Sequence, residues 1–376
     1  MLLKNLCSFS KGIQIKRDLT SIDYVIPYLH YGDLYKKYNV KLNLNEIHSE
    51  IIKVDNSFYN SKYQINNNDI VMNLTSENYD DLGKCIIVKN SENKPFLAGM
   101  ETHLIKIHSS SIIPEYLNYY FESDSFLKCI QQFITGMKVF RVKPTDILNI
   151  DISLPNLQYQ QHIVDIIGSL DDKIESNNKI IEKMNNLLNV KTNELLLCKT
   201  KKIQLNDIIE ECKEKSEIEL VPYSVINTGK VIIQNEQFNK EIAKNTKGKY
   251  KKIKKDYFVY NPSRINIGSI GVMEDEIGCV SPIYVVFKCI EEYKIYLQQL
   301  LTFDSMIKEI NKRCSGSVRQ ALSFNDLCSI EIYDIEKEKL KIYNKYCDSI
   351  IRITKKLEQE NKLLENQKKL YLAKFF

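Results

Sequence analysis

The sequence lacks paired cysteines, long apolar runs and glycine-rich cofactor loops, and each absence excludes a class of protein. Its ten cysteines include no CxxC pair, which argues against a zinc site and against the disulfide framework of a secreted protein. No apolar run approaches the ~18 residues of a membrane-spanning helix. The N-terminal segment MLLKNLCSFSKG lacks the apolar core of a signal peptide. We therefore expect a cytoplasmic chain with no membrane partner.

Catalytic signatures are missing as well. GxGxxG, GxxxxGK(S/T) and HExxH do not occur, and Asn261-Pro262 is followed by Ser263, where amino-methyltransferases have a second proline. Acidic-x-Lys triplets such as Asp171-Asp172-Lys173 lie in charge-rich helical stretches, where they arise by chance. His103 and His108 are not at the spacing of metal ligands on a helix. The sequence thus predicts a non-catalytic chain with no metal site and no cofactor of its own.

The chain is long enough for two or three domains. It has 376 residues, of which 43% are hydrophobic, so it can bury real cores. The formal net charge is +5 and the pI is about 8.4. This mildly basic balance permits an anionic partner without requiring one.

A long helix is predicted over residues 155–199, with a start signal at Pro155 and Asn156 and no later proline in the run. Apolar residues recur in alternating steps of four and three, which is the seam of a helix that packs lengthwise on another helix. At ~1.5 Å per residue, such a helix spans on the order of 65 Å. The seam positions are Ile163, Ile167, Leu170, Ile174, Asn177, Ile181, Met184, Leu188, Lys191 and Leu195.

A second helix with the same rhythm is predicted over residues 334–376, opened by Asp334 as N-cap. If the two seams pack antiparallel, Asn177 faces Asn361, and buried seam asparagines set the register of helix pairs. The alternative is that each asparagine lies at a solvated edge. The seam positions of this helix are Leu340, Tyr343, Cys347, Ile350, Thr354, Leu357, Asn361, Leu364, Lys368, Tyr371 and Phe375.

The segments before each helix, residues 1–154 and 200–333, both have the pattern of mixed α/β domains. Strands are predicted at 24–29, 70–74, 85–88, 104–107 and 149–154, with a helix at 114–134. Four motifs of the first segment recur in the same order in the second: IPY and VPY, NDIVMN and DYFVYN, LGKCIIV and IGSIGVM, TGMKVFRVKPTDILNIDI and SGSVRQALSFNDLCSIEI. Because chance does not preserve order, we infer an internal duplication. The predicted fold class is α+β, with two pseudo-symmetric α/β domains separated by a long antiparallel two-helix coiled coil.

Two sequence stretches resemble a known family. PNLQYQQHIVDIIGSLDDKIESNNKIIEKM resembles the central conserved helix of type I restriction–modification specificity subunits, and GMKVFRVKPTDILNIDISLP resembles the segment that joins each target-recognition domain to its helix. The second helix departs from the pattern, since no Pro or Gln marks its start. The resemblance implies domains 1–154 and 200–333 that each read half of a split double-stranded DNA site, and spacer helices at 155–199 and 334–376.

The resemblance also implies partners. Two methyltransferase (modification) subunits dock on the helices, and restriction/translocase subunits complete the complex. S-adenosylmethionine, ATP and Mg are then expected only in those subunits. A coiled-coil scaffold that spaces two protein-binding modules without touching DNA is the main alternative, and a stand-alone nuclease or methyltransferase is the other.

Candidate DNA contacts are basic stretches and polar loops, for which the alternative is a solvated surface or a local cap. Seven lysines fall within residues 244–255, where they can neutralise phosphates. Arg and Asn are the usual readers of guanine and adenine. The candidates are Lys36, Lys37, Asn73, Thr75, Ser76, Lys138, Arg141, Lys143, Lys247, Lys249, Lys251, Lys252, Lys254, Lys255, Asn261, Ser263, Arg264, Asn266 and Arg319.

Overall fold

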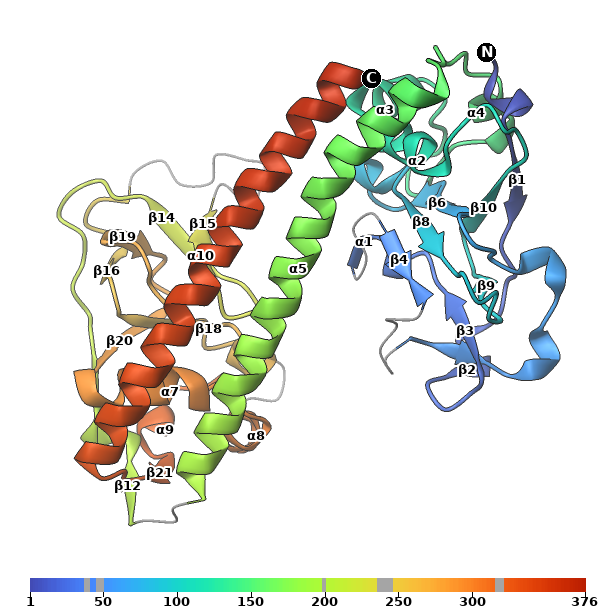
Figure 1. Ribbon diagram of the computed structural model, residues 1–376. Coiled ribbons are helices and arrows are strands. Elements are labelled where there is room, and N and C mark those ends of the chain that lie inside the picture. Colours follow the sequence, from blue (N-terminus) through green and yellow to red (C-terminus); the bar gives the residue numbers. More distant parts are fainter. Residues whose placement is uncertain (37–40, 45–50, 198–200, 235–245, 315–320) are drawn as a thin grey trace. The chain divides into compact units, whose positions relative to one another are not determined.

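The computed structural model describes residues 1–376 except 37–40, 45–50, 198–200, 235–245 and 315–320 (Figure 1). By its internal contacts the chain divides into two compact units. Unit 1 comprises Met1–Asn178 and Glu358–Phe376, and unit 2 comprises Lys179–Leu357. Each long helix therefore contributes one part to each unit.

Unit 1 is built on a mixed sheet with strand order β1-β10-β6-β8-β4. Among the described strands of this sheet, only β4 and β8 pair in parallel. A second sheet has the order β2-β5-β3-β9, and β7 pairs with β11 as a separate ribbon. The strands are β1 (Cys7–Lys11), β2 (Thr20–Ser21), β3 (Ile26–Leu29), β4 (Lys41–Asn43), β5 (Lys53–Val54), β6 (Ile70–Asn73), β7 (Thr75–Ser76), β8 (Cys85–Lys89), β9 (Leu97–Ala98), β10 (Thr102–Ile107) and β11 (Phe140–Arg141).

The helices of unit 1 pack against the main sheet. Pro114 occupies the first turn of α2, where its missing N–H costs no hydrogen bond. The main core joins Leu3, Ile105 and Phe121 to Ile163 on the long helix and Leu372 near the C-terminus. The helices are α1 (Asp33–Lys36), α2 (Pro114–Glu122), α3 (Asp124–Gln131), α4 (Pro144–Leu148) and the first part of α5 (Leu157–Leu196), with 3-10 turns at Leu3–Asn5, Arg17–Leu19, Asn56–Phe58, Ser61–Tyr63 and Tyr79–Asp81.

Unit 2 repeats this plan. Its sheets have the orders β13-β20-β17-β18 and β15-β14-β19-β16, and β12 pairs with β21. The strands are β12 (Lys202–Gln204), β13 (Ile209–Glu211), β14 (Pro222–Val225), β15 (Val231–Ile233), β16 (Lys251–Lys254), β17 (Phe258–Tyr260), β18 (Ile270–Val272), β19 (Ile277–Val280), β20 (Val285–Cys289) and β21 (Glu331–Tyr333). The helices are α7 (Lys294–Leu300), α8 (Asp304–Arg313), α9 (Phe324–Cys328) and α10 (Lys337–Phe375), with 3-10 turns at Leu205–Asp207, Ile265–Ile267 and Glu291–Tyr293.

The predicted duplication is visible in the strand order. β1-β10-β6-β8 in unit 1 corresponds to β13-β20-β17-β18 in unit 2, and every pair in both sets is antiparallel. The parallel pair β3–β9 corresponds to the parallel pair β14–β19. Similar topology with shared motifs in the same order confirms two pseudo-symmetric α/β halves in an α+β fold.

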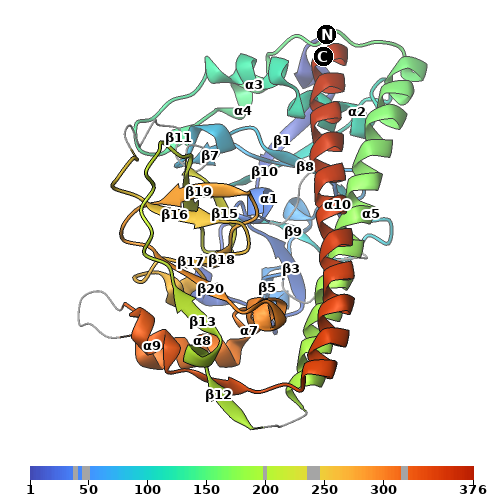
Figure 2. The same cartoon turned by 90° about the vertical axis from the view of Figure 1, so that its left-hand side faces the viewer.

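The two long helices run side by side in opposite directions (Figures 1 and 2). In unit 1, Asp171 on α5 contacts Lys368 on α10, and Asn177 contacts Asn361. In unit 2, Thr192 on α5 shares a hydrogen bond with Tyr343 on α10. As residue numbers rise along α5 they fall along α10, so the pair is antiparallel, as the seams predict.

Three local predictions need correction. The helix predicted over 114–134 is broken at Ser123, whose Oγ accepts from Phe126 N and caps a new helix, α3. The strand predicted over 149–154 is only a single bridge between Leu2 and Asp151. Asp334 does not cap the last helix, which begins at Lys337, because its carboxylate accepts instead from the Tyr293 hydroxyl at 2.5 Å.

Candidate nucleic-acid interface

A small ribbon in unit 1 joins two groups of candidate residues that lie far apart in the sequence. β7 pairs antiparallel with β11, so that Thr75 lies opposite Arg141 and Ser76 opposite Phe140. Val142 N donates to Leu74 O at 3.1 Å, just beyond the ribbon. The polar loop after β6 and the basic segment before α4 therefore form one surface, which the sequence alone had not connected.

Two of the candidates hold this ribbon and do not face solvent. The Asn73 side chain is fully buried, with its Oδ1 accepting from Thr75 N at 3.2 Å and its Nδ2 donating to Asp81 O at 3.3 Å. Ser76 is also buried, and its Oγ accepts from Asn78 N at 3.0 Å. The expectation of base contact is therefore corrected for both, because their polar atoms satisfy the backbone of the turn.

The basic candidates of the ribbon are available for contact. Lys138, Arg141 and Lys143 are all exposed. Within the described parts of the chain, none of the three forms an ion pair. Exposed cations without carboxylate partners on one short segment are the electrostatic feature expected where phosphates are bound.

In the lysine-rich stretch of unit 2, four lysines already have hydrogen-bond or ion-pair partners within the chain. Lys251 donates to Tyr284 O, Lys252 and Lys254 pair with Glu214, and Lys255 pairs with Glu276. Burial lowers the pKa of Lys251, whereas the hydrogen bonds to their glutamates raise the pKa of Lys252 and Lys255. Such surface pairs are weak enough to exchange for phosphate. Lys247 and Lys249, in the turn before β16, are exposed.

The loop after β17 occupies the place in unit 2 that the ribbon loop occupies in unit 1. Asn261 Oδ1 accepts from Ser263 N at 3.1 Å and shapes the turn. Leu322 N donates to Pro262 O at 3.1 Å, which matches the Val142-to-Leu74 bond of unit 1. Arg264 is exposed and Asn266 half-exposed. Lys36 ends α1; its side chain, Lys37 and Arg319 lie outside what the structure describes.

The predicted seam of the helix pair is largely buried. Asn177 Nδ2 donates to Asn361 Oδ1 at 2.9 Å and to Glu360 Oε2 at 3.1 Å, while Asn361 Nδ2 donates to Asn178 Oδ1 at 2.8 Å. Asn177 and Asn361 are both buried. The other buried seam residues are Ile163, Ile167, Ile174, Leu188, Leu195, Leu340, Tyr343, Cys347, Ile350 and Lys368, and the half-buried ones are Leu170, Ile181, Met184, Lys191, Thr354, Leu357, Leu364, Tyr371 and Phe375.

An ionic cluster around the buried Lys368 of unit 1 was missed by the sequence reasoning. Lys368 Nζ lies 2.9 Å from Asp171 Oδ1 and 2.9 Å from Glu122 Oε2. Tyr119 OH donates to Asp171 Oδ2 at 2.9 Å, and Asn118 Nδ2 donates to Glu122 Oε1 at 2.7 Å. Burial raises the pKa of Glu122 to about 7 against the opposing charge of Lys368. The signal in the sequence was Lys368 itself, a lysine at a seam position where most residues are apolar.

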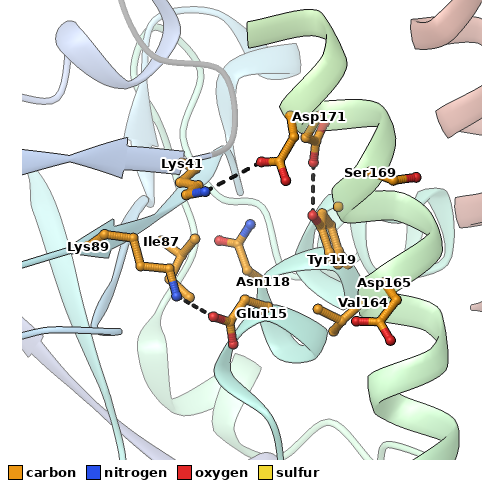
Figure 3. Close-up of a pocket in the computed structure, with 12 residues that line it drawn as sticks. Lys41, Ile87, Lys89, Glu115, Asn118, Tyr119, Val164, Asp165, Ser169 and Asp171 are labelled. Carbon is orange, nitrogen blue, oxygen red and sulfur yellow. Dashed lines mark hydrogen bonds and ion pairs between the residues drawn. The ribbon is translucent and has the colours of Figure 1, made fainter. Parts of the chain in front are cut away.

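A pocket of about 340 Å³ adjoins this cluster (Figure 3). Figure 3 shows Tyr119 directed toward Asp171, with Lys89 directed toward Glu115. Lys41 pairs with Asp172 at 3.5 Å. Because both lysines that line the pocket are paired, with Asp172 and Glu115, the pocket offers no unpaired cation to an anionic ligand.

The described residues also lack a metal-binding cluster and a membrane-spanning helix. No three His, Cys, Asp or Glu side chains among them are grouped so as to hold a metal ion. His103 is buried in β10, and burial lowers its pKa to about 4. No helix within the described ranges is long and apolar enough to cross a membrane.

Part of the chain matches a known family, and the whole chain is similar in fold to a solved structure. Residues 1–186 match the family model described as type I restriction modification DNA specificity domain. The S subunit of a type I restriction–modification system from M. genitalium is 14% identical, with a TM-score of 0.59, and the match covers 100% of this chain and 95% of that one. The HsdS subunit from Thermoanaerobacter tengcongensis is 14% identical over 100% of this chain and 95% of its own, with a TM-score of 0.33. No curated protein matches the chain. The similarity to the M. genitalium structure covers the whole chain, so the two proteins share their fold over its full length.

Proposed function

We propose, on the premise that this chain belongs to the type I restriction–modification specificity family, that it gives a restriction–modification complex its DNA sequence specificity. Each α/β unit reads one half of a split site in double-stranded DNA. The observation that carries the proposal is the polar loop after β6 and its counterpart after β17. Each is hydrogen-bonded to the segment that leads toward a long helix, through Val142 in unit 1 and Leu322 in unit 2.

The chemistry of these loops suits a duplex. In unit 1, Lys138 and Lys143 can neutralise phosphates, while the guanidinium of Arg141 can also form paired hydrogen bonds with guanine. In unit 2, Arg264 and Asn266 lie in the loop after β17 and are of the residue types that read guanine and adenine. Exposure of all five side chains to solvent, full or partial, supports this assignment.

The helix pair sets the gap between the half-sites and docks the partners. We assign two modification subunits to its outer surface, and restriction/translocase subunits to the completed complex. Support comes from apolar side chains on α10 that point away from the seam: Ile342 (70% exposed) and Ile353 (45%) in unit 2, and Leu363 (70%) and Leu370 (72%) in unit 1. Repeated exposed apolar residues on a helix favour contact with another protein.

We assign no catalysis to this chain. S-adenosylmethionine, ATP and Mg belong to the modification and restriction subunits, and the cytoplasm is the compartment where such a complex meets DNA. A non-catalytic role predicts that the purified chain neither methylates nor cleaves DNA by itself. Methyl transfer by the chain without partners, measured with labelled cofactor, would contradict it.

Salt-dependent binding tests the DNA assignment. The chain assembled with its modification subunits is titrated with labelled duplex carrying the motif methylated in its host, at several salt concentrations. We expect log affinity to fall linearly with log salt, and Lys138→Ala to reduce the slope by about 1. Lys128→Ala, at an exposed lysine on α3, is the matched control. An affinity with no salt slope would favour instead a scaffold that never touches DNA.

A further inference from the structure

The hairpin formed by residues 135–141 carries an apolar tip. Met137 is 95% exposed, more than any other large hydrophobic side chain in the described parts of the chain. Val25, also in unit 1, is 74% exposed. Single exposed apolar residues are common on protein surfaces. The support beneath Met137 and the charges around it distinguish this residue from the others.

The hairpin holds its tip in one geometry. Thr135 and Arg141 exchange backbone hydrogen bonds in both directions, each 2.9 Å long. Gly136 has φ +103°, and a Cβ placed there would lie 2.1 Å from Val139 O, so only glycine fits. The Phe140 and Tyr79 rings pack edge to face, with 5.6 Å between their centroids. Because the hairpin holds Met137 in a fixed position, little conformational entropy is lost when this side chain binds a partner.

The charges around the tip indicate which partner it fits. Lys138 follows Met137 directly, and Arg141 and Lys143 are exposed on the same segment. In a duplex, the apolar side chain would contact stacked bases while the flanking cations contact phosphates. The neighbouring loop, which Tyr79 brings against Phe140, carries the exposed carboxylates of Glu77 and Asp80. Carboxylates are repelled by the phosphates of DNA and of an anionic membrane alike, but in a DNA groove they can accept hydrogen bonds from cytosine, so DNA is favoured over a membrane.

We propose that Met137 is an apolar wedge that enters the base stack of the half-site read by unit 1. The inference rests on the proposed DNA-binding function. Proteins that deform a duplex insert Met, Leu, Ile, Phe or Pro side chains between base steps and partly unstack them. In the second sequence copy the aligned residue is Ser317. The wedge therefore acts in one half-site only, and the other half-site is an internal control.

The test uses the complex with its modification subunits and a duplex that carries the host's methylated motif. Met137→Ala, Met137→Leu and Val25→Ala are compared by affinity, salt slope and fluorescence of 2-aminopurine placed in either half-site. We expect Met137→Ala to weaken binding about tenfold with an unchanged salt slope, because no counterion is involved. Met137→Leu restores affinity to within about twofold. The alanine variant loses the fluorescence increase in the unit 1 half-site and keeps the signal of the other.

Three results would overturn the wedge. Equal affinity and fluorescence for Met137→Ala and Val25→Ala, with salt-dependent DNA binding intact, would refute the wedge alone. Loss of binding to anionic phospholipid vesicles by Met137→Ala, with unchanged DNA binding, would assign the tip to a lipid surface. Absence of salt-dependent DNA binding by the unsubstituted complex would refute the proposed function and this inference with it.

Discussion

Asn177 and Asn361 face each other across the antiparallel helix pair, and Nδ2 of Asn177 lies 2.9 Å from Oδ1 of Asn361. Both side chains are buried, and Oδ1 of Asn177 has no hydrogen-bond partner within the described structure. A buried polar pair of this kind costs stability but disfavours every register in which one asparagine meets an apolar residue. The pair therefore fixes which turn of α5 meets which turn of α10.

Replacing both asparagines with leucine should stabilise unit 1. The double variant removes an unsatisfied buried acceptor and adds apolar area, which we expect to raise the free energy of unfolding by about 1–2 kcal/mol and the melting temperature by a few degrees. Calorimetry of the two single variants and the double variant completes a double-mutant cycle, which gives the interaction free energy between the two positions. A melting temperature at or below that of the unsubstituted protein would show that the pair stabilises more than it costs.

The Glu122 carboxyl should make stability depend on pH. Its folded-state pKa is about 7, above the ordinary 4.5, because burial disfavours its charged form. Between those values the folded chain binds more protons than the unfolded chain, so this contribution is present at low pH and is lost as pH rises through about 7. Relative to Glu122→Gln, stability should fall by on the order of 2 kcal/mol from pH 5 to pH 8. A difference that stays flat across this range in urea titrations would contradict the assignment.

Removing Lys368 should destabilise unit 1 strongly. Burial alone would lower the pKa of Lys368, but the charges of Glu122 and Asp171 outweigh it and raise the value. Lys368→Met leaves two carboxylates close together without a cation, at an expected cost of about 3–5 kcal/mol. Lys369→Met, at an exposed neighbour on the same helix, is the control. Equal unfolding midpoints for the two variants would show that the cluster is dispensable.

Gly136→Ala should weaken both the local stability of the hairpin and the binding of DNA. The left-handed φ and the close Val139 carbonyl leave no room for a methyl group, so the hairpin must open. We expect a loss of about 1–3 kcal/mol in local stability and a severalfold weaker affinity for the duplex. An alanine variant that binds as tightly as the unsubstituted complex would show that the hairpin does not contact DNA.

Lengthening the helix pair should change the gap in the recognised site. One heptad inserted into α5 alone misaligns its seam with that of α10 and should damage assembly with the modification subunits. A heptad inserted into both helices adds about 10 Å, close to three base pairs. The readout is the methylated motif, and an unchanged gap would refute the spacer role.

The helices and their pairing were predictable because their information is periodic. The apolar seam repeats over the forty residues of α5, so a few irregular positions do not hide it. The two seam asparagines indicate the register of the helix pair. Shared motifs in the same order likewise predicted two equivalent halves. Short elements such as α4 escaped, because five residues carry no measurable period. The break at Ser123 was hidden by apolar spacing that continues across it.

The candidate interface was less accessible to sequence reasoning. Asn73 is buried and Arg141 is exposed, yet the sequence made both candidates for DNA contact. Lys252 and Lys255 form ion pairs with glutamates far away along the chain. The many lysines in this stretch of sequence had instead suggested a cationic surface without ion-pair partners. Pairing of β7 with β11 depends on long-range geometry, which no local pattern encodes.

The most direct test is the pattern of methylated bases that this chain specifies. The chain is expressed with its modification subunits in cells whose DNA carries no other adenine methylation, and the genome is sequenced with detection of modified bases. The account predicts one split motif, with two short half-sites, a fixed gap and adenine methylated on both strands. Methylation of a continuous motif, or no sequence-specific methylation from an assembled complex, would contradict it.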